Sequence, residues 1–382
     1  MSEKKYLFEY RSIFIFIGFF LITISNIYIF DKAKIIGILL ILALAYIEVF
    51  KYGISNKDLL YFILFFVLFV GQILFQQLTI NQIINAIFYY IVLLTMVILG
   101  KNILKNGKDF YLCTLSVGLA NLIGFFYSPT LLIQQIMRSG SRVRVYGSFT
   151  HPNALGSIII MCLISGMIYL STIDKISNKQ KKVSIVFCLF LIFQLILTDS
   201  RGYLILFVVI ISIYFLKNTS NKSILYKYTI FLVLSILGIY FIYFFWNYYI
   251  IEDASYLSRL QGFNSLNLSG IKYWFGYGMV SSNDINYEIL DGGSMEIAWV
   301  KMLYKVGMIG VVLFILILLK VFFTSKKIKN CKIKYAFYAT YFSFLVGSLV
   351  ESSLVTIFNA NPILIWISLS SIPNIEKRRK NI

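Results

Sequence analysis

Long apolar runs recur through almost the whole chain, and they restrict its possible folds more than any other feature. Of the 382 residues, 59% are hydrophobic and only 13% are charged, and the mean hydropathy is +0.82. A soluble domain of this size cannot bury so much apolar surface, whereas a lipid bilayer accommodates it. The runs have the length of helices and lack the weak ten-residue alternation of a membrane barrel. The sequence therefore predicts an all-α integral membrane protein.

The runs predict a polytopic bundle of about twelve transmembrane helices in a single integral membrane domain, residues 1–382. The expected spans are residues 12–30, 35–50, 59–75, 83–100, 109–127, 153–172, 183–199, 202–216, 228–250, 303–323, 335–353 and 358–373. Two connecting segments are long, at about 128–152 and 251–302. The second is a large loop between the ninth and tenth spans.

Basic residues are distributed unevenly over the connecting segments. Most of the 35 lysines and arginines fall in alternate segments, beginning with the one before the first span. Cytoplasmic loops carry an excess of Lys and Arg, so this alternation predicts that both termini are cytoplasmic. The same topology explains the net charge of +19 without nucleic acid as a partner. The two long segments are then expected on the outer face.

Arg138, Arg142 and Arg144 break this pattern, because they lie in the first of the two long outer segments. The planar guanidinium of arginine suits phosphate and carboxylate groups. Arg142 and Arg144 would share one face of an extended chain, which favours an anion-binding site. The alternative is that interfacial arginines bind anionic lipid headgroups. The apolar stretch before Arg138 is expected to lie along the membrane interface.

The motif Gly147-Ser-Phe-Thr-His151-Pro152-Asn153 follows the arginines and leads into an apolar run. Pro152 in the first turn, with Thr150 or His151 at the cap, predicts the start of a helix. The backbone N–H groups of that start would add to the anion site. His151 is the only histidine of the chain. It serves either as a helix cap or, together with Asn153, as an accessory site residue.

Asp199-Ser-Arg201-Gly202 separates two apolar runs with almost no loop. An arginine at the outer end of an apolar helix is costly unless it is paired or holds a ligand. Asp199 is an obvious partner, so a structural ion pair is the alternative to ligand binding by Arg201. The tight turn predicts that Arg201 lies in the same outer layer as Arg144.

The second outer segment holds Arg259, the aromatic stretch Tyr273–Gly278 and Glu296. Aromatic rings beside glycines suit stacking on sugar rings, and they equally suit the aromatic belt of a membrane protein. Glu296 at the outer boundary is a candidate general base above a lipid-linked substrate. Its alternatives are pairing with Lys301 or balancing a helix dipole. Phosphate-binding glycine-rich loops and metal-ligand spacings do not occur, so neither a metal nor another cofactor is expected.

The chain resembles the O-antigen ligase/polymerase family of bacterial membrane glycosyltransferases in features spread from about residue 140 to 310. These features are Arg144–Asn153 leading into a span, Asp199–Gly202 between spans, Gly276-Tyr-Gly278 in a large outer loop, and a charged segment ending in Lys305–Gly310. The first 130 residues resemble the family only in hydrophobicity. The resemblance implies a GT-C-like bundle in the bacterial cytoplasmic membrane. It also implies action without metal on glycans linked to undecaprenyl pyrophosphate.

The resemblance further implies roles for individual residues. Arg144, Arg201 and Arg259 take the arginine positions of the family's motifs and are expected to hold the pyrophosphate, with Arg142 beside them. Ligases of the family carry a histidine near the end of the large loop, where this chain has Glu296. This departure favours a repeat-unit polymerase over a ligase, with Glu296 as the catalytic residue that would orient or deprotonate the attacking hydroxyl. Membrane lipid and a chain-length regulator are further expected partners.

The expected function is therefore polymerisation of capsule, exopolysaccharide or O-antigen repeat units, with inversion at the anomeric carbon. One alternative is a ligase that moves finished glycan to another acceptor. Another is a transporter or flippase of lipid-linked sugars. A flippase should carry charged residues deep inside several spans along a path. Here charge concentrates at the outer boundary, which favours chemistry at the membrane surface.

Overall fold

The computed structural model describes residues 2–76, 79–138, 144–173, 177–218, 270–278, 298–350 and 360–379. In these ranges the chain is all-helical, and an isolated antiparallel bridge joins Ile27 to Phe149. The helices are α1 (Ser2–Ile24), α2 (Ala33–Tyr52), α3 (Asn56–Gln76), α4 (Ile80–Leu94), α5 (Gly107–Phe126), α6 (Pro129–Met137), α7 (Pro152–Thr172), α8 (Asn178–Thr198), α9 (Arg201–Asn218), α12 (Ile271–Phe275), α13 (Ala298–Ser325), α14 (Cys331–Val350) and α15 (Ala360–Arg379).

By length and composition, six helices of the described ranges are able to cross a membrane. They are α2, α3, α4 with the turns that follow it, α5, α7 and α13. Every predicted span except 228–250 overlaps a described helix. The segment 228–250 and most of the loop 251–302 lie outside the described residues, so a total of about twelve spans stays a prediction. The all-helical architecture is confirmed where the chain is described, and the six long apolar helices indicate a membrane protein.

The outward surfaces of the bundle are apolar. Exposed side chains include Phe66 and Val67 on α3 and Val186 and Ile196 on α8, each more than half accessible. Contiguous apolar surface of this kind is rare on soluble proteins and marks contact with another apolar phase. The exposed faces therefore fit a lipid environment.

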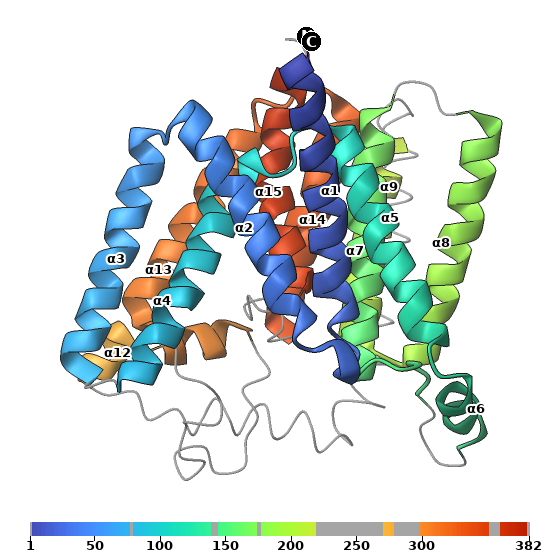
Figure 1. Ribbon diagram of the computed structural model, residues 1–382, viewed down its shortest axis with the longest axis horizontal. Helices are drawn as coiled ribbons and strands as arrows, with labels where there is room; N and C mark the ends of the chain where they lie inside the picture. Colours follow the sequence, from blue (N-terminus) through green and yellow to red (C-terminus); the bar gives the residue numbers. More distant parts are fainter. Residues whose placement is uncertain are drawn as a thin grey trace, which may run out of the picture.

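The helices run between two ends of the bundle that differ in character. In Figure 1, α1 begins, α15 ends and α3 begins at the top, where α4 also connects to α5. This end is called the lysine-rich end, because the first turn of α3 contains Lys57 and the connection from α4 to α5 contains Lys101 and Lys105. The bottom holds the connection 144–151, α6 and α12, and is called the arginine end. Both long predicted outer segments thus reach the arginine end, opposite the two chain ends. That the lysine-rich end faces the cytoplasm stays a prediction from the distribution of Lys and Arg over the connecting segments.

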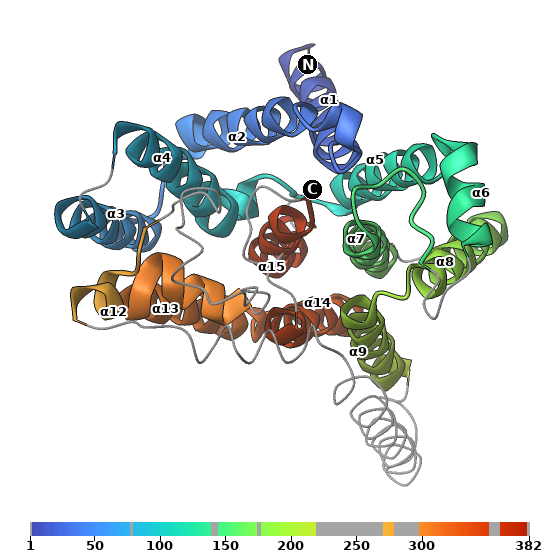
Figure 2. The same ribbon diagram turned by 90° about the horizontal axis from the view of Figure 1, so that it is seen from below.

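Close helix packing builds the core. A Cβ on Gly37 of α2 would stand 2.7 Å from the carbonyl oxygen of Gly18 on α1, so these two glycines permit the close approach of their helices. Figure 2 shows α15 surrounded by the other helices. Residues from every face of α15 are buried, including Ile363, Trp366 and Ile372. A helix that is buried on all of its faces belongs in such a central position.

A buried charge network ties three helices together near the lysine-rich end. Arg11 of α1 donates to Glu48 of α2 at 2.9 Å and to Asp109 of α5 at 3.0 Å. Lys105 forms a second ion pair with Glu48. Arg11, Glu48 and Asp109 are all less than 10% exposed. Buried charges are tolerated only when they are paired and hydrogen-bonded, which is the case for this network.

Candidate functional site

The segment from Arg144 to His151 is fixed at the arginine end by the ends of other helices. Three backbone hydrogen bonds hold it: Val145 N–H to Leu197 O at 2.9 Å, Ser148 N–H to Gly124 O at 3.0 Å, and Thr150 N–H to Asn26 O at 2.9 Å. The acceptors belong to three separate hairpin regions of the chain. The connection is thus positioned by the bundle itself, as a rigid binding loop must be.

Gln135 of α6 holds the same connection from the other side. Its side-chain oxygen accepts the backbone N–H groups of Tyr146 at 2.9 Å and Gly147 at 3.0 Å. Its side-chain nitrogen donates to the Gly147 carbonyl at 2.9 Å. Gly147 has φ +60°, and a Cβ there would press on the backbone of Phe125. Glutamine at 135 and glycine at 147 together define the path of the chain just after Arg144.

Helix α6 itself lies across the bundle. Figure 1 looks along this helix and Figure 2 shows it lengthwise, so its axis is roughly perpendicular to those of its neighbours. Its exposed residues include Ile133, Ile136 and Met137. This arrangement agrees with the prediction that the stretch lies along the membrane interface. Arg138, at the end of α6, is exposed.

Replacing Gln135 by leucine is expected to loosen residues 146–147 more than it lowers the stability of the whole bundle. Three hydrogen bonds would be lost, and each contributes about 1 kcal/mol to local order. Hydrogen–deuterium exchange at residues 144–151 and thermal unfolding in detergent measure the two effects. The neighbouring exposed Gln134 provides the matched control, Gln134→Leu, for which both values should stay near wild type. Equal losses in the two variants would contradict a role for Gln135 in positioning the loop.

His151 and Pro152 start α7 as the sequence predicted. His151 is the N-cap, and its Nδ1 accepts the backbone N–H of Asn153 at 3.1 Å, while Pro152 occupies the first turn. The helix-cap interpretation of His151 is thereby confirmed. The side-chain oxygen of Asn153 accepts a hydrogen bond from the Ser200 hydroxyl at 2.7 Å. The two motifs that contain Asn153 and Ser200 are therefore in direct contact.

Asp199 makes a second contact between these motifs. It ends α8 in the left-handed conformation, with φ 46° and ψ 38°. Its Oδ2 lies 4.0 Å from Nε of Arg144, and both side chains are about one-third exposed. The described ion-pair partner of Asp199 is thus Arg144. At this distance and exposure such a pair contributes little to stability.

The other predicted site residues are described in part or not at all. Arg201 is the first residue of α9, so its backbone lies beside Asp199 at the arginine end, but its side chain is outside the described set. Arg142, Arg259 and Glu296 also lie outside the described residues. Their roles remain predictions. In the described ranges, no group of three or more His, Cys, Asp or Glu residues is arranged to hold a metal ion.

The remaining two motifs of the sequence, Gly276–Gly278 and Lys305–Gly310, also meet in space. The helix α13 is kinked at Gly307, which has φ 65° and ψ −174°. At the kink Tyr277 N–H donates to the Tyr304 carbonyl at 2.7 Å, and Gly278 N–H donates to the Lys305 carbonyl at 3.0 Å. The short helix α12 and the residues after it therefore dock on α13 through backbone hydrogen bonds.

Replacing Gly307 by alanine is expected to lower the free energy of unfolding substantially, because two separate costs add. An L-residue in this backbone region costs about 1–3 kcal/mol. In addition, the new Cβ would collide with the backbone carbonyl of Trp274, which adds about 1–3 kcal/mol. Gly53 has nearly the same backbone angles (φ 71°, ψ 179°), and its Cβ position is open. Gly53→Ala therefore isolates the first cost, and denaturant titration of both variants in detergent should give the larger loss for Gly307→Ala. Equal losses would show that the contact with α12 carries no energy.

Two polar residues that the sequence interpretation overlooked support this docking. Gln72 of α3 donates to the carbonyl groups of Phe275 at 2.6 Å and Lys305 at 2.9 Å. Its side-chain oxygen accepts from the hydroxyl of Tyr90 on α4 at 2.9 Å. Gln72 is fully buried. A single glutamine inside an apolar run was the available signal, since a buried polar group in a membrane helix needs a partner.

Lysine and aromatic side chains gather around the docked segment. Nζ of Lys272 lies 4.7 Å above the ring of Tyr277, and Tyr277 stacks on Tyr304 with a centroid distance of 4.4 Å. Nζ of Lys305 lies 5.6 Å from the ring of Tyr89. Cation–π contacts of this kind stabilise cations in a partly apolar setting. Trp274, 53% exposed, is the aromatic side chain of this group most available for stacking.

The four motifs are thus brought together in pairs. Residues 144–153 contact 199–200, and residues 274–278 contact 304–307. Both pairs lie at the arginine end in Figure 1, but Figure 2 places them on opposite sides of α15, with α7 and α9 on one side and α12 and α13 on the other. The first pair carries the candidate anion-binding arginines. Comparison of the chain with the models of known protein families and with curated proteins finds no match.

Proposed function

We propose that the protein is a membrane glycosyltransferase that polymerises lipid-linked polysaccharide repeat units, as in capsule, exopolysaccharide or O-antigen synthesis. The observation that carries the proposal is the contact between residues 144–153 and the turn at Asp199 and Ser200. Arg144 and Asp199 are 4.0 Å apart and Asn153 accepts from Ser200, although the two segments are separated by two helices. Their meeting at the arginine end supports one anion-binding site at the membrane boundary.

The proposed site would stabilise a leaving pyrophosphate. In the reaction, the hydroxyl oxygen of the incoming lipid-linked unit attacks the anomeric carbon of the growing glycan. The bond from that carbon to the pyrophosphate oxygen breaks, and negative charge develops on the leaving group. A preorganised guanidinium beside that charge lowers the barrier, and this is the role proposed for Arg144 with Arg142, Arg201 and Arg259.

The hydroxyl proton is proposed to pass to Glu296. The lateral helix α6 and the exposed Trp274 suit substrates that enter along the membrane surface, with a glycan at the aromatic side chain. Undecaprenyl-pyrophosphate-linked oligosaccharide is the substrate class that combines a long apolar chain, two phosphates and sugar rings. The pyrophosphate assignment rests on the arginines, and the sugar assignment rests on the aromatic group around Tyr277.

The decisive experiment incubates the purified protein with lipid-linked repeat units and separates the products by size. A ladder of regularly spaced products supports the polymerase. A single transfer to a foreign acceptor would identify a ligase instead. Movement of intact lipid-linked units between the leaflets of vesicles, without any new glycosidic bond, would replace the proposal by a flippase.

A further inference from the structure

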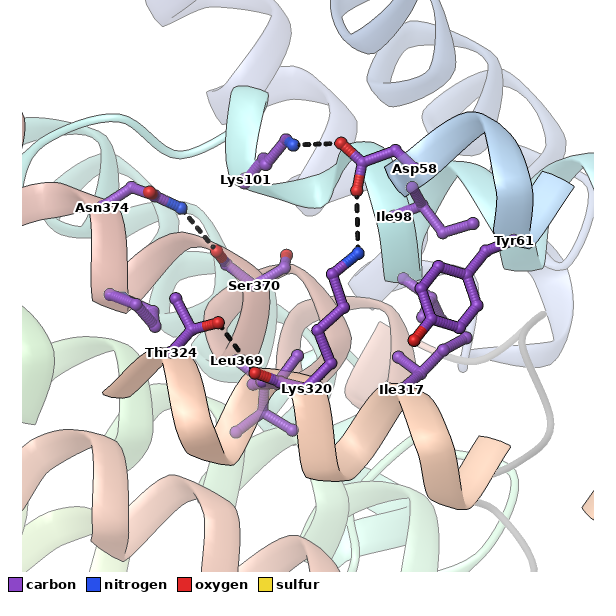
Figure 3. Close-up of a pocket in the computed structure, with 13 residues that line it drawn as sticks. Asp58, Tyr61, Ile98, Lys101, Ile317, Lys320, Thr324, Leu369, Ser370 and Asn374 are labelled. Atoms are coloured by element: carbon purple, nitrogen blue, oxygen red, sulfur yellow. Dashed lines mark hydrogen bonds and ion pairs between the residues drawn. The ribbon is translucent and has the colours of Figure 1, made fainter. Parts of the chain in front are cut away.

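A cavity of about 150 Å³ lies between α3, α13, α15 and the turns that follow α4, close to the lysine-rich end (Figure 3). This volume is similar to that of a cavity that binds one benzene-sized molecule. Its polar wall includes Asp58, Tyr61, Lys101, Lys320, Ser370 and Asn374. The cavity is called the lysine pocket here. It is distant from the arginine end and takes no part in the proposed transfer reaction.

Charge in the lysine pocket is unbalanced. Asp58 is 4% exposed, and its Oδ1 accepts from Nζ of Lys320 at 3.0 Å. Its Oδ2 pairs with Lys101. The chain thereby places two ammonium groups around one carboxylate, which leaves a net charge of +1 in the polar wall. A single lysine would neutralise Asp58, so the second positive charge exceeds what the buried carboxylate requires.

The two lysines also retain hydrogen-bonding capacity. An ammonium group has three N–H donors. Among the described residues, Asp58 supplies the only side-chain or backbone acceptor that either Lys101 or Lys320 reaches. The side chains are 31% and 35% exposed, so the other donors face the pocket or solvent. Lys320 is further held by the ring of Tyr61, with Nζ 4.4 Å from the centroid.

The remaining walls add neutral polar groups and an apolar surface. Ser370 and Asn374 line one side, and the side-chain nitrogen of Asn374 donates to the Ser370 carbonyl at 3.2 Å. Ile98, Ile317 and Leu369 form the apolar surface. A metal cation is disfavoured by the net positive charge, and a wholly apolar ligand would leave the ammonium donors without acceptors. The lining therefore selects an anionic group with several acceptor oxygens.

We propose that the lysine pocket binds a phosphate group, held by charge-assisted hydrogen bonds from Lys101 and Lys320. Phosphate offers the oxygens that ammonium groups bind, and the neighbouring apolar wall accommodates a short organic substituent. The phosphate belongs either to an anionic lipid headgroup or to a soluble phosphate compound.

Inorganic phosphate is the probe for the first measurement, by calorimetric titration of the purified full-length protein in detergent. Lys101→Gln and Lys320→Gln are each expected to weaken phosphate binding roughly tenfold or more, because each removes a charged hydrogen bond. The matched control is Lys326→Gln. Lys326 is exposed just after α13 and is not among the residues that line the pocket, so this variant should bind phosphate as the wild type does. Unchanged affinity in both pocket variants would overturn the proposal.

Asp58→Asn separates ligand binding from a purely structural ion-pair cluster, since it keeps both lysines and raises the net charge of the pocket. Phosphate affinity should stay equal or increase, even if thermal stability falls. A loss of stability accompanied by lost phosphate binding would show that the cluster is only structural. This variant keeps the proposal testable if either lysine variant fails to fold.

The source of the phosphate is distinguished in nanodiscs. Native mass spectrometry would compare protein from nanodiscs of phosphatidylglycerol with protein from nanodiscs of phosphatidylcholine. Retention of phosphatidylglycerol by the wild type, and its loss in Lys320→Gln, would assign a lipid headgroup. Binding of inorganic phosphate without selective lipid retention would assign a soluble phosphate compound. Absence of both would refute the pocket as a phosphate site.

Discussion

Replacing Arg144 by lysine is expected to lower polymer formation by roughly 100-fold while single lipid-linked units accumulate. Lysine preserves the charge but loses the planar fork that contacts two phosphate oxygens at once. It also shortens the reach of the side chain beside Asp199, which lies 4.0 Å from the Arg144 Nε. The measurement is the length distribution of products from purified protein and lipid-linked repeat units. Arg201→Lys should give the same result.

Arg138→Lys is the matched control for this prediction. Arg138 belongs to the same connection but is exposed at the end of α6, outside the contact with the Asp199 turn. Its replacement should leave the product ladder near wild type. Asp199→Asn should reduce polymer less than Arg144→Lys does, because Asp199 only lies beside the guanidinium that is proposed to contact the pyrophosphate. Long chains in both Arg144→Lys and Arg201→Lys would show that the pyrophosphate assignment is wrong.

Replacing Arg11 by methionine is expected to lower the free energy of unfolding by about 3–5 kcal/mol. Methionine fills much of the same volume but leaves Glu48 and Asp109 buried, the latter 2% exposed, without their shared cation. Both carboxylates would lose the guanidinium donors of Arg11 in a low-dielectric interior, and Asp109 would keep the backbone N–H of Lys105 at 2.7 Å as a donor to its Oδ2. Lys105 compensates only in part, through its own pair with Glu48.

Denaturant titration in detergent micelles provides the measurement for Arg11→Met. Lys34→Met is the control, because Lys34 pairs with Asp31 at 2.6 Å on the surface, where Asp31 is 58% exposed. An exposed pair contributes about 0–1 kcal/mol, so the control should unfold close to wild type. If both variants lost the same small amount, the Arg11 network would have no special role in the fold.

Local features of the chain were predictable wherever short-range chemistry determines them. Apolar runs predicted helices, because lipid offers no hydrogen-bond partners to the backbone and a helix satisfies its own backbone groups. The start of α7 was predicted from Pro152 and the cap position, and His151 occupies that cap. The lateral course of α6 followed from its apolar stretch beside Arg138. Each of these inferences used neighbours within a few residues along the chain.

Contacts between residues that are far apart in the sequence were harder to predict. The sequence offered Asp199 as the partner of its near neighbour Arg201, and that pairing stays a prediction because the Arg201 side chain lies outside the described set. The structure adds a contact of Asp199 with Arg144 that the sequence did not suggest. That contact needs α7 and α8 to return the chain to the same end. Gln135 carries no sequence signal that distinguishes it from Gln134, yet only Gln135 faces the connection at Gly147. Side-chain direction on a short helix decided this difference.

The sequence by itself determined the membrane class, the helical segments and the uneven distribution of charge, because hydropathy and charge act residue by residue. Only the tertiary structure decided which charges meet. Lys320 reaches Asp58 across 262 positions and Lys101 reaches it across 43, so the lysine pocket has no local signature. The docking of α12 at Gly307 likewise depends on two backbones approaching more closely than any side chain allows. Such contacts depend on how the helices pack, which follows from the bundle as a whole.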